Sequence, residues 1–135
     1  MKVVAAILVY KNKILAFKRP FSEKKKHISL KYEFPGGKIK KEETPIHALR
    51  RELKEELEVN IKNFKKYYET SYSYPDFDVN IKFYISQISN LNFKLKAHKE
   101  YKLMNISNLR KLDWLEADYA VISYLEKNGF SDYLS

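Results

Sequence analysis

The sequence predicts an α/β domain in which a central mixed β-sheet lies between helices. Three observations favour this class. Short runs of β-branched and aromatic residues recur along the chain, two other stretches have helical periodicity, and the two kinds of segment follow one another in mixed order. A chain of 135 residues, 44% of them hydrophobic, can bury one core, so we expect residues 1–135 to form a single domain.

Five segments are expected to be strands, near residues 3–10, 13–19, 66–73, 79–87 and 101–106. The first two are short apolar runs separated by a polar turn at 11–13. This pattern predicts a hairpin inside the fold and not a signal peptide or a membrane span. The segment 79–87 alternates apolar and polar residues, as a half-buried strand does. Tyr74-Pro75-Asp76 predicts the turn before it.

Two helices are expected, at about 45–57 and 117–128. Thr44 can cap the first helix, and Pro45 suits its first position because no amide hydrogen is needed there. The second helix carries apolar residues on one face, and Gly129 follows its last turn.

The chain has 26 Lys and Arg against 17 Asp and Glu, a formal net charge of +9, and no cysteine. The missing cysteines exclude a disulfide framework, Cys-ligated zinc and thiol catalysis, and agree with a reducing compartment. The basic charge makes nucleotides, nucleic acid and acidic lipid candidate partners, although lysines spread over solvated faces are the simpler explanation. The densest basic run is Lys24-Lys25-Lys26. We expect a soluble, cytoplasmic protein with no membrane partner.

Acidic residues gather on the first helix, shortly after a glycine pair. Gly36 and Gly37 follow a proline, and their backbone is free to approach a ligand closely. Glu52, Glu55 and Glu56 are spaced i, i+3 and i+4, so their carboxylates share one face that borders the core. These like charges repel, and a bound divalent cation would remove the repulsion. Hard oxygen ligands favour Mg²⁺, with Mn²⁺ as the alternative. Taken singly, an ordinary turn and a solvated acidic face explain the two features.

The spacing of the whole segment is more specific. Five residues separate Gly37 from Glu43, seven more precede Arg51, and the run 52–59 follows. This order resembles the Nudix box, Gly-x5-Glu-x7-Arg-Glu-hydrophobic-x-Glu-Glu-x-Gly-hydrophobic, at eight of the nine defined positions. The departure is Glu58, where the family usually has the glycine that ends the helix. We expect Glu58 to end this helix less comfortably.

Further segments, at 31–40, 43–45 and 112–118, resemble the MutT branch of the Nudix family. The resemblance implies a Nudix-type α/β/α sandwich, water attack on a phosphorus atom, and release of a nucleoside monophosphate and pyrophosphate. It implies metal ligands at Glu52, Glu55, Glu56 and the Gly37 carbonyl, with Glu52 or a loop carboxylate as the general base. Glu100 resembles a late acidic residue that serves as an extra ligand or base, and a solvated glutamate is the alternative.

The resemblance also implies roles for residues around the metal ligands. Arg19 and Lys38 are expected to contact phosphate, whereas Glu43 and Arg51 hold the loop to the helix. A carboxylate at Asp118 falls where MutT-like enzymes read the base edge, and it can accept from an amino group, or donate if protonated. Three aromatic residues are candidates for stacking on the base, with core packing as the alternative: Phe34, Tyr74 and Phe77.

The leading candidate substrate is therefore 8-oxo-dGTP. The alternatives are a cytidine nucleotide, a dinucleotide, a nucleotide sugar or capped RNA, and, from another class, a non-catalytic basic domain that binds nucleic acid. A short chain has little room for the insertions that larger substrates require, and the intact carboxylates argue against a decayed scaffold. We expect a nucleotide substrate, no obligate nucleic acid, and a monomer or weak dimer.

Overall fold

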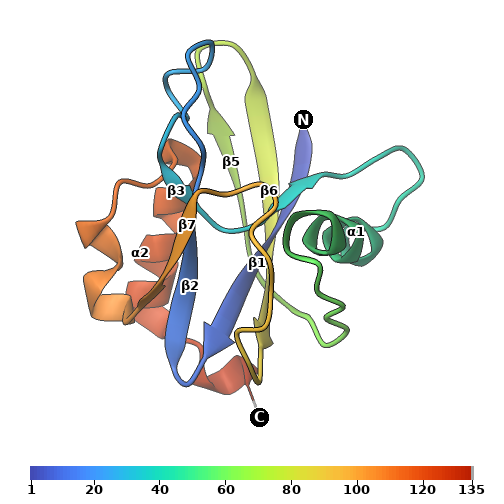
Figure 1. Ribbon diagram of the computed structural model, residues 1–135, viewed down its shortest axis with the longest axis vertical. Coiled ribbons are helices and arrows are strands. Elements are labelled where there is room, and N and C mark those ends of the chain that lie inside the picture. The colour runs from blue at the N-terminus through green and yellow to red at the C-terminus, as the bar shows by residue number, and fades with distance from the viewer. Residues whose placement is uncertain (135) are drawn as a thin grey trace.

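The computed structural model describes residues 1–134 and contains one mixed sheet with helices on both sides (Figure 1). The strands are β1 (Lys2–Tyr10), β2 (Lys13–Lys18), β3 (Tyr32–Glu33), β4 (Gly36–Lys38), β5 (Lys65–Ser73), β6 (Asp78–Gln87) and β7 (Glu100–Met104). The helices are α1 (Pro45–Leu57) and α2 (Tyr119–Asn128), and the short 3-10 turns are η1 (Ile106–Lys111), η2 (Glu116–Asp118) and η3 (Ser131–Tyr133).

All five predicted strands and both helices are present, with small differences at their ends. The second helix begins at Tyr119 and not at 117, because residues 116–118 form a 3-10 turn. The last strand ends at Met104, since the chain turns into η1 two residues later. Strands β3 and β4, of two and three residues, are too short to show an alternating pattern and were not predicted.

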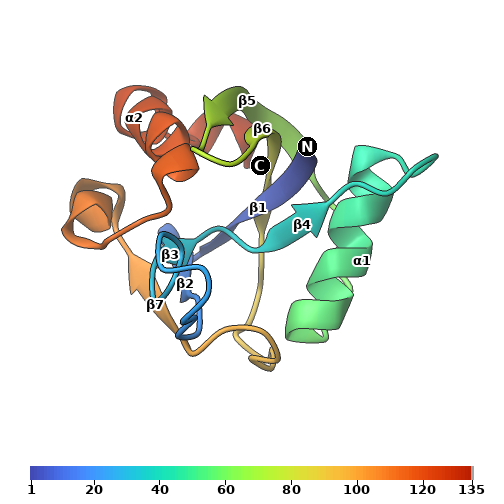
Figure 2. The same ribbon diagram turned by 90° about the horizontal axis from the view of Figure 1, so that it is seen from above.

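The sheet has the strand order β3-β2-β1-β6-β5, with β4 paired to β1 and β7 paired to β2. Strands β1 and β6 run parallel, and the other pairs are antiparallel. Helix α1 lies on one side of the sheet and α2 on the other (Figure 2). This arrangement confirms the predicted α/β/α sandwich with a mixed sheet.

The central strand β1 explains how the core is divided. Its even-numbered residues from 4 to 8 pack in one cluster with Leu49 and Leu53 of α1. Its odd-numbered residues from 5 to 9 pack in a second cluster with Val121 and Leu125 of α2. Because both faces of β1 are buried, neither face needs polar side chains, and β1 is a continuous apolar run in the sequence.

Strand β4 brings the glycine pair beside α1. It pairs with the first half of β1, and Gly36 and Gly37 lie opposite Ala5 and Val4. The other half of β1 forms the predicted hairpin with β2. The residues after β3 therefore run along β1 and bring Gly37 against Glu52 of α1.

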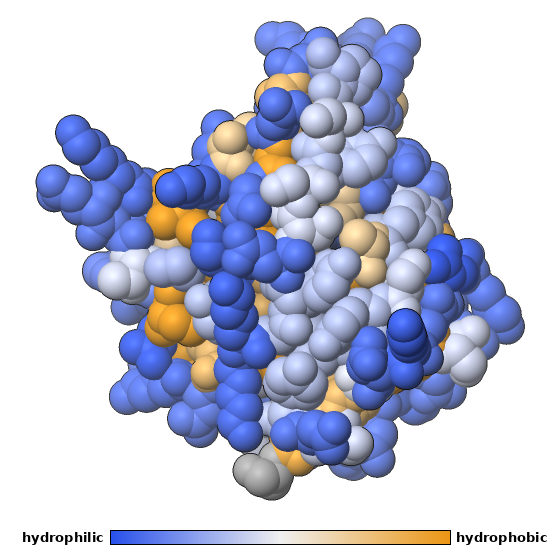
Figure 3. All heavy atoms as spheres, turned by 180° about the vertical axis from the view of Figure 1, so that it is seen from behind, coloured by the Kyte–Doolittle hydropathy of each residue, from blue (hydrophilic) through white to orange (hydrophobic). Residues whose placement is uncertain are grey.

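The face opposite that of Figure 1 is largely hydrophilic, and its hydrophobic side chains form small separate areas (Figure 3). No helix within residues 1–134 is long and apolar enough to cross a membrane.

Candidate active site

Helix α1 carries the acidic residues of the site. Its first turn is fixed by Thr44, whose side-chain oxygen accepts the backbone N–H of His47 at 3.2 Å, and by Pro45 at the first helical position. Both expectations for this end of the helix are confirmed. The apolar face of α1 is buried against the sheet, and Glu52 and Glu56 reach the glycine pair of β4.

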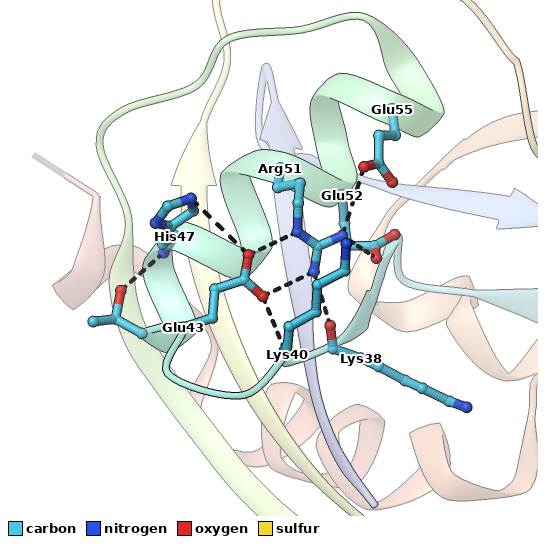
Figure 4. A network of polar contacts seen from close by, with 8 residues as sticks. Lys38, Lys40, Glu43, His47, Arg51, Glu52 and Glu55 are labelled. Atoms are coloured by element: carbon cyan, nitrogen blue, oxygen red, sulfur yellow. Dashed lines mark hydrogen bonds and ion pairs between the residues drawn. The ribbon is translucent and has the colours of Figure 1, made fainter.

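Arg51 joins the loop before α1 to the helix (Figure 4). Its Nε and Nη2 donate to the two carboxylate oxygens of Glu43, at 2.7 and 2.9 Å, and Nη2 also donates to the Lys38 carbonyl at 3.0 Å. The Lys40 amide donates to Glu43 as well, at 2.9 Å. The bond from Arg51, followed by that from Lys40, lowers the pKa of Glu43 to about 2. These bonds hold the loop before α1 against the helix.

The glycine pair lets two carboxylates approach the backbone of β4. A Cβ atom at Gly37 would lie 2.3 Å from the carboxyl carbon of Glu52, so any side chain there would displace Glu52. The Gly36 amide donates to Oε1 of Glu56 at 3.2 Å. At Gly36 itself, a Cβ atom would lie 2.0 Å from the carbonyl oxygen of Val4. Both glycines are therefore required by close packing.

Glu56 is the carboxylate most in need of a positive partner. Burial, followed by the negative charges of Glu33 and Glu52, raises its pKa from 4.5 to about 8. The Gly36 amide and the Arg19 charge oppose this shift without cancelling it. The environment thus disfavours the ionised form of Glu56 until a cation is supplied.

The three carboxylates of α1 do not converge on one point. Glu52 accepts from Nη1 of Arg51 at 2.9 Å, and Glu55, with a side chain 57% exposed, lies 3.6 Å from the same nitrogen. Across residues 1–134, no group of three or more His, Asp or Glu side chains is arranged to hold a metal ion. Arg51 contacts Glu52 and Glu55 through Oε1 alone, so their Oε2 atoms are not engaged by it. The donors nevertheless fit a hard divalent cation, because they are oxygens and Gly37 has no side chain to block them.

A cleft of about 580 Å³ extends from the glycine pair of β4 to the start of α2, and Glu52, Glu55 and Glu56 lie beside it without lining it. Arg19, Lys24, Lys25 and Lys38 contribute positive charge to its lining. The cleft brings together seven of the predicted site residues: Arg19, Phe34, Gly37, Lys38, Tyr74, Phe77 and Asp118.

Asp118 lies at the far side of the cleft from α1 and is 4% exposed. Burial, followed by the charge of Glu33, raises its pKa well above the usual range, and the backbone amide of Phe34 opposes the shift. Its Oδ2 has no hydrogen-bond partner in the part of the chain that the structure describes. Beside it, the Tyr74 hydroxyl accepts the Ala117 amide at 3.1 Å. Asp118 therefore keeps a buried carboxyl oxygen without a partner at the edge of the cleft.

Two of the predicted residues lie differently from the others. The Phe34 ring is 3% exposed and stacks on Trp114 with centroids 4.7 Å apart, so it belongs to the core and forms only the floor of the cleft. Glu100, like Glu52, Glu55 and Glu56, is not among the residues that line the cleft, and it accepts the Tyr32 hydroxyl at 2.9 Å. Its carboxylate is therefore held by β3.

Glu33 also belongs to the site, and no sequence pattern predicted it. Its carboxylate contacts Arg19 and His98 and raises the pKa of both Glu56 and Asp118. A glutamate between the buried Tyr32 and Phe34 was the one available signal, since an acidic residue inside an aromatic run needs a polar partner.

Carboxylates of α1 beside a cleft with a cationic rim are suited to a hydrolase that acts on phosphoanhydride bonds, and comparisons with known proteins agree. The sequence profile of the NUDIX domain matches residues 1–125. The chain is 30% identical over 117 residues to a protein of Buchnera aphidicola subsp. Acyrthosiphon pisum named 8-oxo-dGTP diphosphatase, covering 86% of this chain and 94% of that protein. It is 31% identical over 101 residues to the protein of the same name in Escherichia coli K12, covering 75% and 78%.

Among solved structures, the MutT protein from Methanosarcina mazei Go1 has the same fold, with a TM-score of 0.82 and 17% identity over 94% of this chain and 93% of that one. The chain belongs to the Nudix family of hydrolases. Members of this family generally use a divalent metal ion.

Proposed function

We propose that this chain is a magnesium-dependent pyrophosphohydrolase that converts a nucleoside triphosphate, with 8-oxo-dGTP as the leading candidate, to the monophosphate and pyrophosphate. The observation that carries the proposal is a cleft lined by both the glycine pair, against which Glu52 and Glu56 pack, and the buried carboxyl of Asp118. The relatives named 8-oxo-dGTP diphosphatase support this choice of substrate.

Mg²⁺ at Glu52, Glu55, Glu56 and the Gly37 carbonyl would supply charge neutralisation for the phosphates and orient the attacking water. Glu52 is our candidate for the general base, because its carboxylate packs directly against Gly37. Glu100 is a weaker candidate, since its carboxylate already accepts the Tyr32 hydroxyl.

The cationic rim suits the polyphosphate. Lys38 follows the glycine pair, with its side chain pointing away from the Arg51 network (Figure 4), and Arg19 lies near both Glu33 and Glu56. Both line the cleft, so each can donate to phosphate oxygens as negative charge develops on the leaving pyrophosphate.

Asp118 is our candidate for reading the base edge. Burial raises the pKa of its carboxyl and so favours the protonated form, which can donate as well as accept, whereas an ionised carboxylate only accepts. Tyr74 and Phe77 lie beside it, with ring centroids 5.0 Å apart, and present partly exposed aromatic surface to the base.

The test is a panel of nucleoside triphosphates that includes 8-oxo-dGTP and CTP, assayed with Mg²⁺ for pyrophosphate and for orthophosphate. We expect pyrophosphate and the monophosphate in equal amounts. Orthophosphate as the sole product would contradict the mechanism, and tight binding of RNA or DNA without any hydrolysis would favour a nucleic-acid-binding domain.

The base pocket has its own test. Asp118→Ala should change the ranking among the bases of the panel more than the overall rate, because the residue lies away from the carboxylates of α1. The ratio of kcat/KM for two bases measures this effect. An unchanged ranking would remove Asp118 from the pocket.

We also propose a single domain that works in the cytoplasm as a monomer or weak dimer and needs no nucleic acid. The absence of cysteine supports a reducing compartment. Large hydrophobic side chains exposed within residues 1–134 are few, which supports weak self-association at most. Light scattering on the purified protein tests the oligomeric state.

A further inference from the structure

Glu33 lies at the centre of an ion-pair chain that crosses the cleft wall. Its carboxylate oxygens accept from Nη1 of Arg19 at 3.1 and 3.2 Å, and Oε2 also contacts Nε2 of His98 at 2.8 Å. The Glu33 side chain is 13% exposed and that of His98 is 1% exposed. The chain of contacts therefore runs from the protein interior, through Glu33, to a guanidinium in the cleft.

His98 fixes the inner end of this chain. Its ring packs on Phe17 with centroids 5.3 Å apart, and the amide of the next residue, Lys99, donates to the Lys18 carbonyl at 2.8 Å. A carboxylate only accepts hydrogen bonds, so Nε2 of His98 carries the hydrogen and donates it to Glu33. The buried His98 side chain thereby fixes the position of the Glu33 carboxylate on the side away from Arg19.

Arg19 is the outer end, and most of its donors are still available. Glu33 uses only Nη1, and within residues 1–134 neither Nε nor Nη2 has an acceptor. The side chain is 33% exposed and lines the cleft. A planar guanidinium that is fixed at one nitrogen presents its remaining N–H groups in a set direction, which suits phosphate oxygens.

We propose that Glu33 and His98 are positioning residues that present the guanidinium of Arg19 to the phosphates of the substrate. Both act through Arg19: His98 does not line the cleft, and Glu33, which does, has its carboxylate engaged by Arg19 and His98. The inference rests on the proposed function, because it assumes that a polyphosphate enters this cleft. Because Arg19 is held in place before binding, less conformational entropy is lost when the phosphates bind. The contribution of Glu33 and His98 to affinity should therefore be largest for the polyphosphate part of the substrate.

The experiment measures the affinity of inorganic pyrophosphate and of a nucleoside monophosphate, each with Mg²⁺, by isothermal titration calorimetry. Glu33→Gln should weaken pyrophosphate binding about tenfold and leave the monophosphate nearly unchanged. His98→Leu should have the same effect, whereas His98→Gln, which can still donate to Glu33, should restore most of the affinity. Thermal melts of each variant establish that it is folded.

A double-mutant cycle with Arg19→Ala separates positioning from other roles. If Glu33 acts through Arg19, Glu33→Gln should cause no further loss in the Arg19→Ala background. Additive losses would overturn the inference, as would equal losses for pyrophosphate and monophosphate. The matched control is Glu126→Gln, which breaks a similar Arg–Glu pair with Arg110 outside the cleft and should leave both affinities unchanged.

The outcomes for the two proposals are distinct. If the parent chain hydrolyses triphosphates and Glu33→Gln binds pyrophosphate as tightly as the parent, the inference about Glu33 is wrong and the proposed function stands. If the parent hydrolyses no triphosphate, the proposed function is wrong, and the pyrophosphate cycle still decides whether Glu33 and His98 position Arg19.

Discussion

Among single residues, Glu56 lies in an environment that disfavours its ionised form. Burial, with the charges of Glu33 and Glu52, raises its pKa from 4.5 to about 8. Between these values the folded, metal-free chain keeps a proton that the unfolded chain has released. The contribution of Glu56 to stability is thus present below pH 4.5 and is lost as the pH rises through about 8. Metal binding requires Glu56 to be ionised, and the ionised form is disfavoured in the metal-free fold. Glu56 therefore lowers the stability of the metal-free protein at neutral pH.

Glu56→Gln should therefore stabilise the metal-free protein and nearly abolish turnover, because glutamine keeps the size of the side chain but cannot ionise. The gain in free energy of unfolding should grow with pH and reach the order of a few kcal/mol near pH 8. Thermal melts in EDTA, near pH 5 and near pH 8, measure it. The matched control is Glu55→Gln, whose exposed side chain should lower turnover at nearly constant Tm. An equal gain at both pH values would contradict the assignment to Glu56.

At the level of elements, the loop before α1 depends on the ion pair between Arg51 and Glu43. The pair ties the loop to the second turn of the helix, and the same guanidinium holds Glu52. The folded-state pKa of Glu43 is lowered from 4.5 to about 2, so its contribution to stability is present above pH 4.5 and is lost as the pH falls toward 2.

Glu43→Gln should lower the Tm by several degrees at neutral pH and also reduce kcat/KM, because the loop and Glu52 lose their common support. The Tm difference between parent and variant should shrink in acid. Thermal melts from neutral pH down to near pH 3 follow this loss. A variant with parental Tm and reduced activity would instead give Glu43 a direct role in the chemistry.

The other end of α1 carries a strained residue. Glu58 has a φ of 54°, in the left-handed region, and its amide donates to the Lys54 carbonyl at 3.1 Å, so it closes the helix as the glycine of the family motif would. Its side chain pairs with Lys96 at 2.8 Å and Lys94 at 3.3 Å. These exposed ion pairs offset part of the cost of the left-handed backbone.

Glu58→Gly should raise the Tm by a few degrees, since glycine adopts this conformation freely and the lost ion pairs are exposed. Glu58→Gln is the matched control, because it removes the charge and keeps the strain, and it should lower the Tm slightly. Differential scanning calorimetry compares the three proteins. A lower Tm in the glycine variant would mean that the lysine contacts outweigh the strain.

In the whole molecule, features that are local in the sequence could be predicted and features made by strand pairing could not. The apolar run of β1 and the spacing of the carboxylates on α1 each lie within one element, so the sequence predicted both the sheet and the acidic face of α1. Glu33 meets Arg19 and His98 only because β2 pairs with β3 on one edge and with β7 on the other. Its partners lie 14 and 65 residues away in the chain, and the periodicity of a sequence does not predict contacts over such separations.

The net charge of +9 also acts over the whole molecule. A basic protein attracts a polyanionic substrate to a cleft with a cationic rim, and salt screens this attraction over a length of about 10 Å at 0.1 M ionic strength. Attraction affects encounter and binding. The chemistry inside the cleft is screened much less, because it takes place among partly buried groups.

Raising the salt concentration severalfold should therefore increase KM for a nucleoside triphosphate severalfold and change kcat little. A nucleoside diphosphate, which carries less negative charge, is the matched control, and its KM should rise less. Initial rates at constant free Mg²⁺ measure both effects. A fall in kcat at constant KM would show that salt acts on the catalytic groups themselves, and equal effects on the two substrates would show that the net charge does not steer them.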